Sequence, residues 1–363
     1  MTSRSLSRRR FSETLIEKES TASAVLSHGK GGTQMESVFP DRRSTESLKG
    51  IFTFFVILRH INNRCGLVSD WRLLLIFDSM GYLSVAMYFF ISGFGLMRAY
   101  KTRAGYLGTF PQRRLLPFYT DCLFTIVLYA IFRFFTTGFT AGEFFRSMLF
   151  GYTIVENGWY LQAILVFYVL FYFVFSTKLG TGLKVFLMLA ASMIYMDVCI
   201  HYGRGDWWYS SILSLTLGFT WGACAERIEA FLSHRRKYLL ALPASLAVFC
   251  ALFSLSVVRE SIVFKMLSAP AFSVFVILLV RAVRVDCGFF RFLGKRSFQI
   301  YSLHGICLLL WRTGALYITD RYAFAAASLV SSYALALALY PVYGVVERGV
   351  IGILRRLKCG VSR

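Results

Sequence analysis

The stretch Lys49-Gly-Ile-Phe-Thr-Phe-Phe-Val-Ile-Leu-Arg59-His60 decides the fold, because an apolar run begins beside a cation and stops at Arg59 and His60. At ~1.5 Å per helical residue, the run covers ~16 Å, roughly half of a ~30 Å bilayer core. In a membrane helix, Lys49 would lie at a water boundary and His60 near the middle of the bilayer. An imidazole at that depth is costly unless it faces a polar cavity or a partner, so His60 is a candidate functional residue.

The composition of the whole chain supports this interpretation. The 363 residues are 56% hydrophobic and only 16% charged, and the mean hydropathy is +0.58. Soluble domains contain about 45–50% apolar and about 25% charged residues. Because apolar runs recur along nearly the whole length, the sequence predicts an all-α, polytopic membrane helix bundle and excludes a soluble helical core.

Ten apolar runs predict ten transmembrane helices, at about residues 50–66, 74–97, 115–135, 158–176, 185–200, 209–225, 238–257, 262–280, 298–318 and 323–345. An even number places both termini on one side of the membrane. The segments on that side hold 30 of the 40 Lys and Arg residues, a bias that marks the cytoplasmic side. The net charge of +21 therefore indicates topology and not nucleic acid binding.

Three parts of the chain are distinguished by composition. Residues 1–43 are rich in Ser, Arg, Glu and Thr and predict a disordered basic tail without a signal peptide, with either Met1 or Met35 as the start. Residues 44–347 are expected to form the transmembrane domain, and residues 348–363 a basic cytoplasmic tail. The eight cysteines include no CxxC pair, which favours buried free thiols, and we expect no metal site.

Two histidines fall inside predicted spans. Imidazole is the usual proton acceptor for a hydroxyl or amine nucleophile near neutral pH. The polar turn that follows His60 favours a cavity open to the far side, whereas the alternative is a histidine satisfied inside the bundle. We take His60 as the candidate catalytic residue and His304 as a structural or substrate-binding imidazole.

Two further stretches, Ser92–Gly93 and Arg113–Arg114, could serve either a functional role or a structural one, which is helix packing for the first and membrane anchoring for the second. Ser92 and Gly93 would let helices approach closely, and Ser92 has no nucleophile-elbow sequence around it. Arg113 and Arg114 lie at a predicted cytoplasmic edge, where paired guanidinium groups suit a phosphate-bearing ligand or anionic lipid headgroups equally well.

Aromatic and polar residues gather at the predicted far side. Trp159 and Tyr160 fit an interfacial aromatic belt, while Glu156 is placed to orient a sugar or a histidine. The loop from His201 to Trp208 combines aromatic rings with Asp and Arg, which suits carbohydrate stacking. We keep these residues as candidate acceptor contacts.

Together these stretches resemble the acyltransferase-3 family, the bacterial integral-membrane O-acyltransferases of surface glycans. The family has an Arg, ten residues and then a His in its first span, and this chain has Lys49 and His60 at that spacing. Four more family motifs are matched in order: Phe89, Phe90, Ser92, Gly93 and Phe94; Arg113, Arg114, Pro117 and Tyr119; Trp159, Tyr160 and Leu161; and Phe292, Leu293, Gly294, Ser297, Phe298, Ile300, Tyr301 and His304. The resemblance covers about residues 45–345.

The resemblance implies a membrane O-acyltransferase that uses acyl-CoA, with acetyl-CoA expected, and transfers groups other than amino-acyl groups. It implies that Lys49, Arg113 and Arg114 bind the donor and that His60 is the base or a transient acyl carrier. Lys49 keeps the charge of the family's Arg but cannot form the two parallel hydrogen bonds that a guanidinium makes to a phosphate or carboxylate. The residues expected to contact the substrate are Ser92, Glu156, Trp159, Tyr160 and His304.

The implied acceptor is a cell-surface or exported glycan, or a lipid-linked sugar, and the implied location is the bacterial cytoplasmic (inner) membrane, among its lipids. A transporter or flippase for a glycan or lipid intermediate would use similar basic faces and a polar cavity. However, transporters often show repeat symmetry and broken helices in matching halves, and the sequence shows neither. Acylation of a small-molecule sugar is the remaining alternative.

Overall fold

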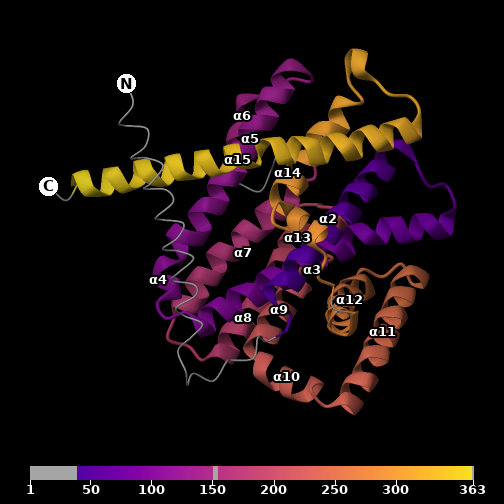
Figure 1. Cartoon of the computed structure of the whole chain (residues 1–363), viewed down its shortest axis with the longest axis vertical. Helices are drawn as coiled ribbons and strands as arrows, with labels where there is room; N and C mark the ends of the chain where they lie inside the picture. The colour runs from indigo at the N-terminus through magenta and orange to yellow at the C-terminus, as the bar shows by residue number, and fades with distance from the viewer. Residues whose placement is uncertain (1–38, 150–153, 284, 362–363) are drawn as a thin grey trace, which may run out of the picture. The chain divides into compact units, whose positions relative to one another are not determined.

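A computed structural model describes residues 39–149, 154–283 and 285–361 (Figure 1). These residues form helices and connecting turns without a strand, which confirms the all-α prediction. Most of the predicted N-terminal tail, residues 1–38, lies outside the described residues. The first described helix begins at Arg42, just inside the predicted tail, with the Asp41 side chain accepting a hydrogen bond from the Ser44 amide as its N-cap.

Ten longer helices make up the bundle: α2 (Arg42–Cys65), α3 (Trp71–Thr102), α5 (Leu116–Phe135), α7 (Trp159–Ser176), α8 (Thr181–His201), α9 (Leu213–Ala223), α11 (Arg235–Val258), α12 (Ile262–Val283), α14 (Ser297–Leu310) and α15 (Arg321–Val361). Shorter elements connect them: α4 (Tyr106–Phe110), the π-helix η1 (Pro111–Leu115), α6 (Ala141–Leu149), the 3₁₀ helix η2 (Asp206–Trp208), α10 (Ala225–Leu232), α13 (Gly288–Gly294) and the 3₁₀ helix η3 (Gly314–Leu316).

Each predicted span falls on one of the ten longer helices, but the count of ten membrane crossings is not confirmed. In the described part of the chain, seven helical segments are long and apolar enough to cross a membrane. The other three are α2, whose apolar stretch is flanked by charged residues, and the short helices α9, with 11 residues, and α14, with 14. The side on which each terminus lies stays a prediction. Helix α15 also runs through most of the predicted C-terminal tail.

Helix α3 is the central element, and it packs against α2, α9 and α12. Its contact with α9 is close because glycines on both helices remove side chains from the interface. A Cβ atom at Gly93 would collide with the carbonyl oxygen of Leu215, and one at Gly218 with the carbonyl oxygen of Phe90. Gly218 and Gly222 form a GxxxG pair on α9. The packing role expected for Gly93 is therefore confirmed.

Helix α2 is held on several sides by α3, α13, α14 and α15. Gly294 of α13 lies directly against the carbonyl oxygen of Glu46, and Gly50 of α2 against that of Phe290. This contact fixes the part of α2 that carries Lys49. By contrast, α11 packs along α12 and contributes no buried residue, so most of its surface is left for lipid.

Candidate functional site

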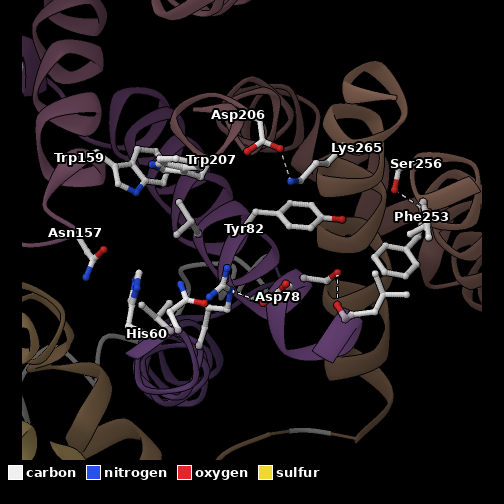
Figure 2. A pocket seen from close by; sticks show the side chains of 18 of the residues that line it. His60, Asp78, Tyr82, Asn157, Trp159, Asp206, Trp207, Phe253, Ser256 and Lys265 are labelled. Atoms are coloured by element: carbon white, nitrogen blue, oxygen red, sulfur yellow. Dashed lines mark hydrogen bonds and ion pairs between the residues drawn. The ribbon is translucent and has the colours of Figure 1, made fainter. Parts of the chain in front are cut away.

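A cavity of about 490 Å³ opens beside His60 (Figure 2). Its walls come from the later half of α2, the earlier half of α3, the start of α7, the η2 turn, the end of α11, the start of α12, and α14. In the view of Figure 2, His60 and Asp78 lie on one side, Asp206 and Lys265 on another, and Tyr82 between them. Elements far apart in the sequence therefore meet around the candidate catalytic histidine.

The two intramembrane histidines lie together. The half-buried His60 ring stacks on the His304 ring, with centroids 5.1 Å apart and planes 28° apart. His304 is fully buried, and its Nδ1 lies 2.5 Å from the carbonyl oxygen of Tyr301. A carbonyl only accepts, so Nδ1 carries the proton and the neutral ring keeps a lone pair on Nε2. That Nε2 has no hydrogen-bond partner among the described residues.

Ion pairs line two walls of the cavity. Arg59 Nε lies 3.2 Å from Asp78 Oδ1, joining α2 to α3. Lys265 Nζ lies 2.5 Å from Asp206 Oδ2, joining α12 to η2, and 5.2 Å from the centre of the Tyr82 ring. Each pair balances its own charge, so the cavity presents polar groups beside aromatic rings with little net charge.

A group of tyrosines extends from the histidines toward Lys49. The Tyr301 ring lies 5.8 Å from His304, 5.4 Å from Tyr160 and 6.3 Å from Tyr88, measured between ring centres. The Tyr88 hydroxyl donates to the Lys49 carbonyl oxygen at 3.0 Å. Aromatic rings with polar tips thus connect the cavity to the Lys49 level of α2.

The predicted donor-binding residues lie at that level. Arg114 donates from Nη2 to the Tyr168 hydroxyl at 2.7 Å, and its guanidinium lies over the same ring. The Lys49 ammonium lies close enough to Arg114 for the two positive charges to repel each other. Arg113 and Arg114 both lie in the π-helical turn η1, where the Leu116 amide bonds to the Pro111 carbonyl, and such turns often occur at functional sites. Arg113 is exposed beside Arg114.

The remaining predicted site residues lie around the cavity but differ in access to it. Trp159 lines the cavity. Tyr160 is buried behind it, and Ser92 is half-buried on α3 beside Gly93. Glu156 is not among the lining residues and instead forms an ion pair with Arg64 at the end of α2.

Asp78 and Lys265 were not singled out from the sequence. An ionisable residue inside an apolar run is itself a signal of function, and both residues carry that signal. Their pairing with Arg59 and Asp206 depends on which helices are neighbours, which the sequence pattern did not reveal. No group of three or more His, Cys, Asp or Glu side chains in the described ranges is arranged to hold a metal ion.

A separate charged cluster lies where α3 ends. Arg98 and Lys101 both bind the Glu226 carboxylate of α10, with the lysine nitrogen 3.0 Å from Oε2. The hydrogen bond from Arg98, followed by that from Lys101, lowers the Glu226 pKa from its ordinary 4.5 to about 2. This cluster joins α3 to α10 and lies outside the cavity.

Comparison with known families decides the identity. The family described as "Acyltransferase domain", acyltransferase-3, matches residues 43–341, which is most of the chain. The chain belongs to the acyltransferase-3 family. Neither the curated proteins nor the solved structures yield a match to it. The acyltransferase-3 match begins at the start of α2 and ends within α15, so it includes every helix that lines the cavity.

The acyltransferase-3 motifs found in the sequence come together in space. The first and last motifs meet at the His60–His304 stack. The middle motif contributes Tyr160, which contacts Tyr88 of the second span and Tyr301 of the last motif. The paired-Arg motif reaches the same helix, α7, through the bond from Arg114 to Tyr168. A multi-pass membrane acyltransferase is therefore the activity class that family and fold support together.

Proposed function

We propose that this protein transfers an acyl group, with acetyl the expected one, from acyl-CoA to a hydroxyl group of a cell-surface or exported glycan. The single observation that carries the proposal is the His60–His304 stack on the wall of a polar, aromatic-lined cavity. An imidazole that reaches a cavity while a second ring fixes its orientation is suited to accept a proton from a hydroxyl nucleophile.

In the proposed reaction, the acceptor hydroxyl oxygen attacks the thioester carbonyl carbon as a nitrogen of His60 takes the hydroxyl proton. A C–O bond forms, and the carbonyl π pair moves onto oxygen. When that oxyanion collapses, the C–S bond breaks, the ester carbonyl re-forms, and the CoA thiolate takes the proton back from His60. Atoms and charges balance without a metal or redox partner.

The acyl-CoA donor is assigned to the part of the site that contains Lys49 and Arg114, called the basic end below. Lys49 and Arg114 would bind phosphates of the CoA nucleotide, for which guanidinium and ammonium groups are suited. The pantetheine arm would then extend along the tyrosine group toward His60. The residues available along that line are Tyr88, Tyr160 and Tyr301.

The acceptor is assigned to the cavity. Sugar rings bind between aromatic faces and charged or amide hydrogen-bonding groups, and the cavity offers Trp159, Trp207 and Tyr82 with the Asp206–Lys265 pair. We place this reaction in the bacterial inner membrane, with both termini cytoplasmic, so that the basic end faces the acyl-CoA pool. The charge bias of the sequence supports that orientation.

The proposal is tested by deleting the gene and measuring the surface glycan by mass spectrometry. We expect a loss of ~42 Da per modified sugar, the difference made by one acetyl group in an acyl transfer of this kind. The deleted strain is then complemented with wild-type protein or with His60→Ala at matched membrane levels. An unchanged glycan mass in the deletion strain contradicts the glycan assignment, and full restoration by His60→Ala contradicts the role of His60.

A further inference from the structure

Arg59 is a charged group at the site that the proposed reaction does not yet use. It precedes His60 in α2, and both side chains line the cavity. The Arg59 side chain is 22% exposed, so it is largely removed from water. A guanidinium next to the reaction centre is expensive to desolvate unless all its donors are satisfied or a negative charge arrives there.

The position of Arg59 is set by two features of α3. Asp78 Oδ1 forms an ion pair with Arg59 Nε at 3.2 Å. One turn further along, Gly81 leaves room for the aliphatic part of the chain, because a Cβ there would lie 3.1 Å from Arg59 Cγ. Figure 2 shows Asp78 on the same side of the cavity as His60. The Arg59 side chain is therefore held by the Asp78 carboxylate at its Nε and by the bare backbone at Gly81 along its aliphatic part.

The ion pair leaves part of the guanidinium unused. Arg59 Nη1 is enclosed and has no hydrogen-bond partner among the described residues. Arginine carries five N–H donors, and the contact with Asp78 occupies only the Nε edge. A largely desolvated guanidinium that lines the cavity beside the candidate catalytic imidazole, and whose donors are not all used, has the properties of a site for a developing oxyanion.

We propose that Arg59 is a catalytic residue that stabilises the oxyanion of the acyl-transfer reaction at His60, with Asp78 as its positioning residue. The inference rests on the proposed function. When the acceptor oxygen adds to the thioester carbon and His60 holds the proton, the carbonyl oxygen gains the negative charge. Arg59 donates to that oxygen, and the bond weakens again as the carbonyl re-forms and the thiolate leaves.

The test uses full-length protein in proteoliposomes with [¹⁴C]acetyl-CoA and a panel of methyl hexosides as acceptors. Arg59→Gln is expected to lower kcat about 10²–10³-fold, the range for loss of one oxyanion donor, while KM for acetyl-CoA changes less than about threefold. Arg59→Lys should recover part of the lost kcat because it keeps the charge without the fork. Asp78→Asn should lower kcat by about tenfold, a smaller loss because the cation is still present.

A matched control is the Arg281–Glu229 pair, which is also half-buried but lies away from the cavity. Arg281→Gln should leave kcat unchanged even if it lowers thermal stability. If Arg59→Gln does not fold, Gly81→Ala provides a second variant, because the added methyl group moves Arg59 by a few tenths of an ångström and should lower kcat severalfold.

The outcomes separate the two proposals. Wild-type protein that labels no hexoside and releases no CoA contradicts the proposed function itself. If wild-type protein transfers acetyl groups and Arg59→Gln keeps the wild-type kcat, the role of Arg59 is overturned. If Arg59→Gln does not fold, a wild-type kcat in Gly81→Ala overturns it. A rise in KM with unchanged kcat also overturns it, because that pattern describes donor binding and not stabilisation of the transition state.

Discussion

The rings of His60 and His304 stack although one lies on α2 and the other on α14, and their ring centres are 5.1 Å apart. The buried ring of His304 is fixed by its bond to the Tyr301 carbonyl, so the cavity-facing ring of His60 rests on a rigid support. The two histidines therefore differ in their surroundings. One ring meets the cavity, and the other sets its orientation and offers an unpaired Nε2.

Two substitutions distinguish the stacking of His304 under His60 from a chemical role of its Nε2. His304→Phe keeps an aromatic ring under His60 but removes Nε2, whereas His304→Ala removes both. If Nε2 takes part in the proton transfer, both variants should lose activity by about 10²-fold or more. Initial rates of acetyl transfer at saturating acetyl-CoA measure this. Retention of near wild-type rates by His304→Phe alone would show that only the stacking matters.

Arg114 is expected to act in donor binding. Arg114→Gln should raise KM for acetyl-CoA by about 10–100-fold, because a charge-assisted hydrogen bond contributes about 1.5–3 kcal/mol and about 1.4 kcal/mol corresponds to tenfold. Its kcat should change little, since the phosphates are bound equally before and during the reaction. Arg236→Gln, on the exposed start of α11, is the control. An unaltered KM in Arg114→Gln would remove the arginine from the donor site.

The α3–α9 contact predicts opposite effects for two glycines of the same helix. Gly93→Ala places a methyl group against the Leu215 carbonyl and should destabilise the protein by about 1–3 kcal/mol. Gly95→Ala adds a methyl group in open space and should stabilise α3 by about 0.5–1 kcal/mol. Thermal unfolding of both variants in detergent is the measurement. Equal melting temperatures would mean that α9 does not approach α3 as closely as described.

The Glu226 cluster predicts an acid-sensitive contribution to stability. The folded-state pKa of Glu226, about 2, lies below the ordinary 4.5, so the stabilisation is fully present above about pH 4.5 and is lost as the pH falls toward 2. Its size is at most about 1 kcal/mol, since the side chain is 57% exposed. Glu226→Gln should therefore be less stable than wild type at pH 7, and the difference should vanish near pH 2. A difference that persists at low pH would contradict the ion-pair explanation.

Much of the fold could be predicted from the sequence because apolar length and spacing are local properties. All ten predicted spans correspond to helices, yet α9 and α14 are too short to meet the criterion for a membrane crossing. Flanking turn residues lengthen the apolar runs: Tyr209 precedes the start of α9 and Trp311 follows the end of α14, and their hydropathy does not mark those helix boundaries.

The site was predicted less completely. His60, Trp159 and Lys49 could be named as candidates because each occurs at a recognisable position in an apolar run or motif. Asp78 also interrupts an apolar run, but its partner Arg59 comes from another helix. An ion pair between helices depends on which faces meet, and that is decided by contacts such as Gly81 against Arg59 and not by spacing along one helix.

The continuity of α2 has a consequence for the rotation of His60 about the helix axis. The eleven-residue step from Lys49 to His60 completes about three turns at 3.6 residues per turn, which brings both residues to nearly the same angular position. A single inserted residue between them would turn His60 by about 100° away from its present direction, while changing its depth by only ~1.5 Å. The spacing of these two residues therefore specifies an angle far more strictly than it specifies a distance.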